Sequence, residues 1–499
     1  MVCWVFEVEV EAANRYAHHV ILIPSSFFHS HSRPRTQLYN STPSITTKLP
    51  HPPPPSSPPP PSFPKLETSI SPPTPKTKTR IHRKMGSLGK SKKAMVTVLC
   101  WVLVSATLQG CSADVPHFWN NTPSRSGSSL VLPLAGKVYP DEYFSVSIDI
   151  GGKAFKMDID TGSVLTWVEC DLSCTGCTQD PEHLYKPHNN FVLRSDPLCA
   201  ASPRSTNQRR RLPRDHCPYK VRYLEGSSST GSLVSDSFSL KLRDGSTLKP
   251  RLTFGCAYEQ NAGDTSPSTT NAGLLGLGKG KVGILSQLVS VNAIQNVLGH
   301  CLSAQGGGFL FLGGDLVPSS KIAWVPFSAG SLTKPYYEAG PAELLHNGKP
   351  TGVGGLQVVF DSGTSVNYFN TEAYAAVVDK VRADLKGKPL EKVDGHEGFP
   401  ICWKGAKPFQ NVNEVKNYFM PLALSFMKGN AQLQLLPEDY LIISNIGAAC
   451  LGIYEVKKKG PREPSIIGDI SMQDKMVIYD NEKKQIGWVS ANCAMLPEP

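Results

Sequence analysis

The sequence DTGSVLTW occupies residues 160–167, and a similar sequence, DSGTS, occupies residues 361–365 in the second half of the chain. Each follows a run of apolar residues, and each is followed further along the chain by two apolar residues and a glycine, at 274–276 and at 466–468. In the first copy, the glycine of the Asp turn, Gly162, and the glycine of the apolar-apolar-Gly element, Gly276, are 114 residues apart. In the second copy, Gly363 and Gly468 are 105 residues apart. We infer from this repeat that the chain folds as two similar lobes related by an approximate twofold axis.

An approximate twofold axis would place the two Asp-[Thr/Ser]-Gly turns face to face. Asp160 and Asp361 would then meet at the bottom of a cleft between the lobes, where two adjacent carboxyl groups cannot both ionise cheaply and therefore share one proton. Glycine allows a following strand to cross close to each turn, and the hydroxyl groups can tie the loops together or orient the carboxylates. A single turn of this kind is usually only structural, but two in matching contexts favour a site. The residues expected to support the pair are Thr161, Gly162, Ser163, Ser362, Gly363 and Thr364.

The rest of the sequence predicts an all-β fold with few helices. Short strand-like segments broken by Gly, Asp and Ser begin near Val138, and the clearest helical pattern covers residues 371–385. The 42 Gly and 42 Pro residues argue against a helical bundle or coiled coil. No stretch approaches the roughly 18 uninterrupted apolar residues of a clear membrane-spanning helix.

The formal net charge of +10 is unevenly distributed along the chain. Residues 1–113 contain 13 basic and 4 acidic side chains, whereas residues 114–499 contain 38 and 37. Because nearly all of the excess lies in a leader without a folding pattern, the charge does not indicate a nucleic-acid partner.

The leader itself consists of two different segments. Residues 1–84 hold 16 of the 42 prolines and are predicted to be disordered. Residues 85–113 contain lysines, an apolar run and small residues in the order of a secretory signal peptide, so we expect Met85 to be the start and residues 1–84 to be absent from the product. If Met1 is the start, the basic, Ser-rich leader could instead direct the protein to a plastid, or the apolar run at 94–108 could remain as an anchor.

Cysteine usage also indicates the secretory pathway. Three of the 13 cysteines lie in the leader, which leaves an even number for disulfide bonds downstream. The closely spaced Cys170, Cys174 and Cys177 resemble a zinc knuckle, but they lack a well-placed fourth ligand and an oxidising compartment favours disulfides. Asn120 lies in a glycosylation sequon. We therefore expect a secreted protein, either extracellular or vacuolar.

The two Asp motifs, the paired apolar-apolar-Gly elements and the Cys-rich first half together resemble the pepsin-like aspartic proteases. The sequences LTFGC, GFLFLGGD, ICWKG and IIGDISMQDKMVIYDNEKKQIGW resemble the nucellin-like branch of the plant enzymes in particular. The resemblance runs from about Val138 to Cys493. It implies a bilobal pepsin-like fold with a propeptide or linker at 114–136, an N-terminal lobe at 137–320 and a C-terminal lobe at 321–499.

The resemblance also implies a reaction. A water molecule held between Asp160 and Asp361 would attack the peptide carbonyl, with one aspartate acting as base and the other as acid. The expected function is thus an aspartic endopeptidase active at acidic pH, because the working pair carries a single proton. Its substrates would be proteins or peptides, and the reaction needs neither a cofactor nor a metal ion. We expect a monomer without a nucleic-acid partner or stable membrane association.

Further residue roles follow from the same resemblance. Ser163 and Thr364 match positions whose hydroxyl groups bond to the carboxylates. The sequence YLEGSSSTG, which begins at Tyr223, matches the flap hairpin that closes over substrate, with Gly226 allowing it to bend and the Tyr223 phenol near Trp167. The alternative is that Trp167 and Tyr223 are ordinary core and strand aromatics.

The resemblance leaves other points open. Disulfide partners are undetermined, except that Cys402 and Cys450 are a candidate bridge within the second lobe. A binding protein on the same fold, like the secreted xylanase inhibitors that have lost catalysis, is a competing function, although both aspartates are present. A glycosidase with paired carboxylates is another, but its acid and base need not come from repeated Asp-x-Gly turns.

Overall fold

The computed structural model describes residues 128–496, except 204–212, 214, 225, 263–270, 320, 428–429 and 457–462. The described residues all belong to one unit, and the second unit, Arg33–Pro123, is not among them. Four expectations lie outside the described residues and stay predictions: the Pro-rich segment 1–84, the signal peptide 85–113, the glycosylation site Asn120 and most of the linker 114–136.

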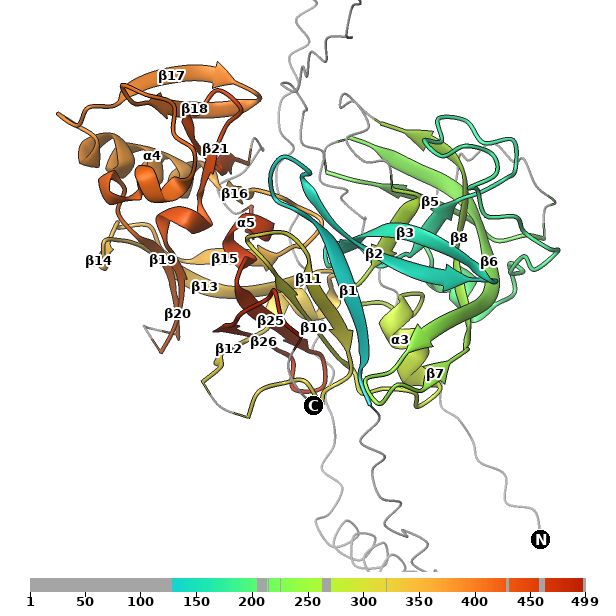
Figure 1. The fold of residues 1–499 in the computed structure, drawn as a ribbon. Helices are drawn as coiled ribbons and strands as arrows, with labels where there is room; N and C mark the ends of the chain where they lie inside the picture. Colours follow the sequence, from blue (N-terminus) through green and yellow to red (C-terminus); the bar gives the residue numbers. More distant parts are fainter. Residues whose placement is uncertain are drawn as a thin grey trace, which may run out of the picture. The chain divides into compact units, whose positions relative to one another are not determined.

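The described chain is mostly β-structure, arranged in three sheets (Figure 1). The largest sheet contains β1 (Leu130–Lys137), β2 (Tyr143–Ile150), β3 (Lys153–Asp160), β4 (Trp167–Glu169), β5 (Pro218–Arg222), β6 (Ser228–Lys241), β7 (Thr247–Leu248), β8 (Arg251–Asn261), β9 (Gly273–Gly276), β10 (Val297–Leu302), β11 (Gly308–Leu312), β12 (Ala323–Pro326), β25 (Lys475–Asp480) and β26 (Gln485–Ser490). The second contains β13 (Tyr337–His346), β14 (Lys349–Pro350), β15 (Leu356–Phe360), β16 (Asn367–Phe369), β19 (Leu422–Phe426), β20 (Ala431–Leu435), β23 (Ile453–Glu455) and β24 (Ser465–Ile467). The third contains β17 (Glu391–His396), β18 (Phe399–Lys404), β21 (Leu441–Ile443) and β22 (Ala449–Leu451).

The helices are short and connect these strands. The α-helices are α2 (Pro197–Ala201), α3 (Ile284–Ser290), α4 (Thr371–Asp384) and α5 (Asp469–Met472), and the 3-10 helices are η1 (Ala329–Thr333), η2 (Val412–Glu414), η3 (Lys416–Tyr418) and η5 (Pro437–Asp439). Helix α4 agrees with the pattern read from the sequence: Asn370 caps its N-terminus by accepting from the Ala373 amide, and Val377 and Val381 are buried on one face.

Two parallel strand pairs repeat the sequence motif in three dimensions. β3 ends at Asp160 and runs parallel to β9, with Asp160 opposite Gly276. In the second half, β15 ends at Phe360 and runs parallel to β24, with Phe360 opposite Ile467. In each copy the next strand, β4 or β16, pairs antiparallel with the same partner, β9 or β24. The predicted all-β fold with two repeated lobes is confirmed.

Strand β3 shows how the sequence places an aspartate at the end of a buried strand. Phe155, Met157 and Ile159 alternate with more exposed residues, so one face of the strand packs into the core. The strand ends at Asp160, whose side chain is still buried, and the turn follows directly. Core packing therefore fixes the position from which this carboxyl group projects.

The largest sheet joins residues from both halves of the chain. Strand β25, near the C-terminus, pairs antiparallel with β10 of the first half, with Leu298 opposite Tyr479 and His300 opposite Val477 (Figure 1). The two halves on either side of the predicted lobe boundary at 320/321 thus contribute strands to one continuous sheet. The boundary itself stays a prediction.

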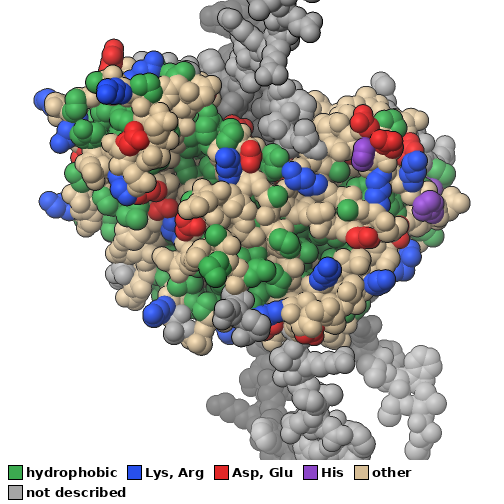
Figure 2. Space-filling view, viewed as in Figure 1, with side chains coloured by type: hydrophobic (Ala, Val, Ile, Leu, Met, Phe, Trp, Pro, Cys, Tyr) green, Lys and Arg blue, Asp and Glu red, His purple; other side chains and the backbone are tan. Residues whose placement is uncertain are grey.

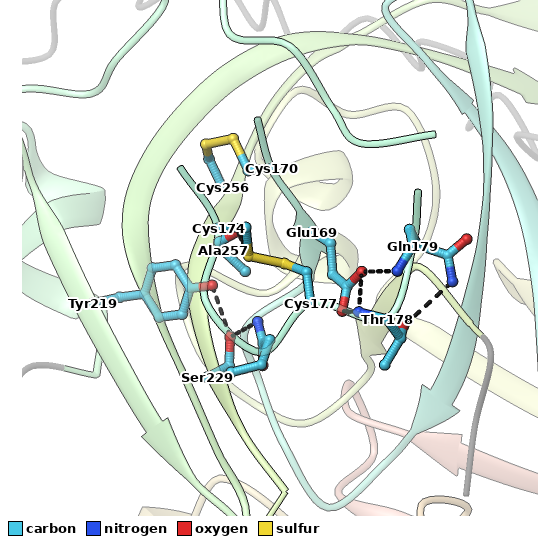
Figure 3. Close-up of a disulfide and its surroundings, with 11 residues drawn as sticks. Glu169, Cys170, Cys174, Cys177, Thr178, Gln179, Tyr219, Ser229, Cys256 and Ala257 are labelled. Atoms are coloured by element: carbon cyan, nitrogen blue, oxygen red, sulfur yellow. Dashed lines mark hydrogen bonds between the residues drawn. A yellow bond between two sulfur atoms is a disulfide. The ribbon is translucent and has the colours of Figure 1, made fainter. Parts of the chain in front are cut away.

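Five disulfide bonds fasten the described residues. They join Cys170–Cys256, Cys174–Cys177, Cys199–Cys217, Cys301–Cys493 and Cys402–Cys450. The candidate bridge of the second lobe is therefore present, and the cysteines considered as a zinc knuckle are paired as disulfides. Next to them, the buried Glu169 carboxylate accepts from the backbone amides of Thr178 at 2.8 Å and Gln179 at 2.9 Å, which anchors the loop that contains Cys174–Cys177 (Figure 3).

The surface carries charges of both signs. On the face shown in Figure 2, Lys and Arg side chains are interspersed with Asp and Glu side chains and with apolar groups. Within the described part of the chain, no helix is both long enough and apolar enough to span a bilayer.

Candidate active site

Thr161 and Ser362 hold the two Asp-containing turns together by crossed hydrogen bonds. The Ser362 amide donates to Thr161 Oγ1 over 2.9 Å, and the Thr161 amide donates to Ser362 Oγ over 3.2 Å. Each hydroxyl group then donates to a backbone carbonyl of the other half, Thr161 to Phe360 at 3.1 Å and Ser362 to Ile159 at 3.3 Å. These reciprocal bonds fix the ends of β3 and β15 against each other.

Asp160 is buried and surrounded by donors from its own turn. Its Oδ1 accepts from the backbone amides of Gly162 at 2.7 Å and Ser163 at 3.0 Å, and its Oδ2 accepts from the Ser163 hydroxyl at 2.5 Å. Only 5% of the residue surface is exposed. Three donors therefore fix the plane of the carboxyl group and favour its ionised form.

Asp361 has a matching environment in the second half. Its Oδ1 accepts from the Gly363 amide at 3.0 Å, and its Oδ2 accepts from the Thr364 hydroxyl at 3.0 Å. The residue is 8% exposed. The hydroxyl three residues after each aspartate thus binds its carboxyl group in both turns, the arrangement that the family resemblance implied for Ser163 and Thr364.

Gly162 and Gly363 allow the two carboxyl groups to approach each other. A β-carbon at Gly162 would lie 2.7 Å from both carboxyl oxygens of Asp361, and a β-carbon at Gly363 would lie 2.7 Å from Oδ1 of Asp160. Both separations are well below the 3.5–4.0 Å at which non-bonded carbon atoms pack. Each carboxyl group therefore lies against the glycine of the other turn, so the two aspartates face each other.

Burial raises the pKa of both aspartates. Burial raises the pKa of Asp160 to about 7, with the negative charge of Asp361 as the second cause, and donors of its own turn act in the opposite direction. Burial also raises the pKa of Asp361, although hydrogen bonds, including one with the Asp160 side chain, lower it. A hydrogen bond between two carboxyl groups requires a proton on one of them. This geometry is what a shared proton requires, and the sharing itself stays a prediction.

Both halves of the chain match known family models. Residues 143–314 match the model described as xylanase inhibitor N-terminal, and residues 341–490 match the model described as xylanase inhibitor C-terminal. The chain is also 39% identical over 383 residues to an aspartic proteinase of Oryza sativa subsp. indica, an alignment that covers 74% of this chain and 92% of the relative. The chain belongs to the pepsin-like aspartic protease family.

More distant relatives agree with this assignment. Among them is the aspartic proteinase nepenthesin-1 of Nepenthes gracilis, 27% identical over 374 residues, with 70% of this chain and 77% of the relative covered. Among solved structures, the basic 7S globulin from soybean superposes with a TM-score of 0.59 over 73% of this chain and 95% of the globulin, at 17% sequence identity. That similarity shows the shared fold.

The two aromatic residues expected near the flap of an aspartic protease lie together in the first half. Trp167 Nε1 donates to the Tyr223 hydroxyl over 2.6 Å. After β5, the chain turns tightly, because the Tyr223 amide donates to the Ser227 carbonyl and the Gly226 amide donates to the Tyr223 carbonyl. Gly226 has a φ of +96°, which favours glycine. The hairpin turn is thus present, and its closure over a substrate stays a prediction.

Asp469 is a buried carboxyl group beside the pair that the sequence reasoning did not single out. It is 1% exposed, its backbone amide donates to the Thr364 carbonyl at 2.8 Å, and its Oδ1 has no hydrogen-bond partner among the described residues. Burial, followed by the charge of Asp361, raises its pKa well above the ordinary value and so favours its protonated form. A comparison of the two copies would have singled it out. Asp469 directly follows the second apolar-apolar-Gly element, whereas the apolar Leu277 occupies the matching position after the first.

Alanine at either turn glycine should separate the carboxyl groups. Gly162→Ala and Gly363→Ala are each expected to lower the free energy of unfolding by about 1–3 kcal/mol, because the added methyl group overlaps the opposite carboxyl group. Gly354→Ala is the control, since a β-carbon there meets nothing within 4 Å. Chemical denaturation measures all three. Equal stabilities of the three variants would contradict the close approach.

The buried carboxyl groups should make the fold more stable in acid. An aspartate whose pKa is 3.8 when unfolded and about 7 when folded binds more protons in the folded state between these values, so stability should fall as pH rises from 3.8 towards 7. Asp469→Asn removes one such group and should make this dependence shallower. Unfolding free energies measured across this pH range test the change, with the exposed Asp171→Asn as the control; an unchanged slope would contradict a raised pKa of Asp469.

Proposed function

We propose that the protein is an aspartic endopeptidase that hydrolyses peptide bonds at acidic pH. The observation that carries the proposal is the reciprocal approach of Asp160 and Asp361, each against the glycine of the other turn. Two buried carboxyl groups that share a proton supply an acid and a base within one site. Within the described residues, His, Cys, Asp and Glu side chains do not gather in a group of three that could hold a metal ion.

In the proposed reaction a water molecule lies between the two carboxyl groups. The ionised aspartate accepts a proton from the water as the water oxygen attacks the carbonyl carbon, and the protonated aspartate donates its proton to the carbonyl oxygen, which gives a gem-diol. The aspartate that took the water's proton then donates it to the amide nitrogen as the C–N bond breaks. The other aspartate takes a proton from a diol hydroxyl as the carbonyl re-forms, which releases an amine and a carboxylic acid and restores the single proton of the pair. Ser163 and Thr364 keep the two carboxyl planes oriented and do not take part in proton transfer. Activity should decline towards neutral pH, because loss of the shared proton leaves two adjacent negative charges.

The flap deepens this proposal. Tyr223 and Gly226 belong to the turn between β5 and β6, and the bond from Trp167 to the Tyr223 hydroxyl fixes the phenol at 2.6 Å from the indole nitrogen. A hairpin whose tip residue is anchored in this way can close over an extended peptide and exclude water from it. The substrates are accordingly proteins or peptides.

The finer family and cellular assignments also belong to the proposal. We place the protein in the nucellin-like branch on the sequences quoted above, and we expect a monomer with lobes at 137–320 and 321–499. Five disulfide bonds in the described residues support passage through the secretory pathway to the cell exterior or the vacuole. A signal peptide at 85–113 and a glycan on Asn120 fit the same route.

A second candidate function is that of a catalytically weak or inactive binding protein. It is favoured by the matched family models, whose descriptions name xylanase inhibitors. Against it stand two intact aspartates, each with a hydroxyl and at least one backbone amide bound to its carboxyl group. Selection for binding alone would not require this symmetric arrangement.

The two functions are separated by one assay series. The purified protein should cleave a denatured protein at acidic pH, with inhibition by pepstatin, and Asp160→Asn or Asp361→Asn should lower the rate by about 10²- to 10⁴-fold, because each removes an acid or base. The exposed Asp171→Asn serves as the control and should retain the wild-type rate. Wild-type cleavage in both pair variants would refute the catalytic pair, and an inactive wild type that inhibits a xylanase would favour the binding protein.

A further inference from the structure

The three residues that follow β9 are hydrogen-bonded to the Asp160 turn. The Leu277 amide donates to the Asp160 carbonyl over 2.8 Å, and the Gly278 amide donates to the Ser163 carbonyl over 2.7 Å. We call residues 277–279 the bridging segment, because the other contacts described below join it to the second half of the chain.

Backbone and side-chain groups join the bridging segment to the second half. The Lys279 amide donates to the Pro335 carbonyl over 2.6 Å, and the Tyr337 hydroxyl donates to the Leu277 carbonyl over 3.0 Å. Tyr337 begins β13 and lies opposite the last residue of β15, which directly precedes Asp361. The bridging segment therefore connects one Asp-containing turn to the strand beside the other.

The Lys279 side chain extends in the same direction and ends among groups of the second half. Its Nζ donates to the Ser331 carbonyl over 2.6 Å and to Ser331 Oγ over 2.7 Å, and Ser331 is fully buried. The Nζ atom also lies 4.6 Å from the ring centre of Phe327 and 5.4 Å from that of Tyr337. Two acceptors and two aromatic rings of the second half thus surround one cation.

The charge of Lys279 depends on these contacts because the side chain has lost part of its water. Burial lowers the pKa of Lys279 to about 8, and the negative charge of Glu338 acts in the opposite direction. The ammonium group is therefore charged at the acidic pH at which the proposed peptidase works. A cation taken partly out of water is stabilised by the groups that replace the water, so moving it away from Ser331 is costly.

The second copy of the repeat has no such lysine. Ser471 occupies the position that matches Lys279, three residues after the glycine of the apolar-apolar-Gly element. Its hydroxyl donates to the Asp439 carbonyl over 2.8 Å and accepts from the side-chain amide of Asn367 over 2.8 Å. Both partners belong to the second half itself. The repeated fold therefore does not require a cation at this position, and the lysine serves the contact between the halves.

We propose that Lys279 is a positioning residue, which binds the bridging segment to the second half and thereby sets the position of the Asp160 turn relative to Asp361. The bridging segment acts in addition to the crossed hydrogen bonds between Thr161 and Ser362 and reaches the turn through other atoms. The kinetic consequence rests on the proposed peptidase function, whereas the positioning itself is a property of the fold.

A purely structural role for Lys279 makes a different prediction. If the aliphatic part of the side chain only fills space between the halves, methionine should keep that packing and leave the site of the folded protein unchanged. If the ammonium group is required, methionine should loosen the bridging segment. Arginine should then restore it, because a guanidinium group keeps the charge, donates hydrogen bonds and stacks on aromatic rings.

The kinetic test compares Lys279→Met and Lys279→Arg with the wild type in the full chain. We expect Lys279→Met to lower kcat about tenfold with little change in KM, because it displaces the aspartate pair and none of the residues proposed to close over substrate. The basic limb of its pH–rate profile should move to lower pH by about 0.5, because a larger separation weakens the repulsion between the carboxylates. Lys279→Arg should recover most of the rate and the wild-type profile.

Amide exchange provides a readout that does not depend on activity. The Gly278 amide donates to the Ser163 carbonyl, so its exchange with deuterium, followed by NMR, reports on the contact between the bridging segment and the Asp160 turn. We expect about tenfold faster exchange at Gly278 in Lys279→Met than in the wild type, and recovery in Lys279→Arg. Exchange of the buried Leu424 amide in β19 provides the internal reference.

Two controls separate this role from surface charge and from a general loss of stability. Lys281→Met makes the same chemical change at an exposed position two residues along the chain, and it should leave kcat, the pH–rate profile and Gly278 exchange unchanged. Val377→Ala removes buried volume from α4 and should lower the melting temperature without altering the profile or Gly278 exchange relative to Leu424. Equal effects of Val377→Ala and Lys279→Met on Gly278 exchange would overturn the proposal.

The remaining outcomes are also decisive. Unchanged Gly278 exchange in Lys279→Met would refute the positioning role, and equally fast exchange in Lys279→Arg and Lys279→Met would contradict the requirement for the charge. Faster exchange in an active enzyme whose pH–rate profile is unchanged would likewise refute an effect on the aspartate pair.

Two further results have a defined meaning. If Lys279→Met fails to fold, Ser331→Ala, which removes one of the two acceptors of the ammonium group, decides by the same exchange measurement. A wild type without acid peptidase activity would refute the proposed function, whereas the exchange measurements would still support or refute the role of Lys279.

Discussion

The crossed hydrogen bonds between Thr161 and Ser362 are the constraint on which the site depends. The backbone amide of each residue donates a hydrogen bond to the hydroxyl oxygen of the other, and each hydroxyl group donates to a backbone carbonyl of the opposite half of the chain. Neither turn can therefore shift without breaking hydrogen bonds to the other turn. Two buried carboxyl groups repel one another as soon as both ionise, and without these hydrogen bonds the two turns would move apart. The hydrogen bonds involve backbone amides and the short side chains of Thr161 and Ser362, which lose little conformational entropy when they are fixed. The close approach of Asp160 and Asp361 is thus enforced by neighbours that carry no charge.

The sequence predicted this centre because the repeat is local in each copy. Each Asp-[Thr/Ser]-Gly turn and its apolar-apolar-Gly partner form one strand pair, and a twofold axis was enough to bring the pairs together. The pairing of β10 with β25 could not be predicted in the same way. The partners are far apart in sequence, and both strands are buried along nearly their whole length, so neither shows the alternation of buried and exposed residues that fixes a register. The bond between Cys301 and Cys493, 192 residues apart, was hidden for the same reason, since an even cysteine count does not specify partners. Asp469 was missed because only its glycine neighbour belonged to the repeated pattern.

Electrostatics and packing oppose each other around the pair. Desolvation is the largest cause of the raised pKa at Asp160, Asp361 and Asp469, so the fold holds these side chains in a medium that disfavours their charge. Donors in each turn partly offset that cost for the two facing aspartates, whereas Asp469 has an oxygen without a donor. The consequence is a difference between these carboxyl groups. Donors stabilise the charge of each facing aspartate, whereas the surroundings of Asp469 favour its protonated form, which adds no repulsion to the charge that the proposed reaction needs.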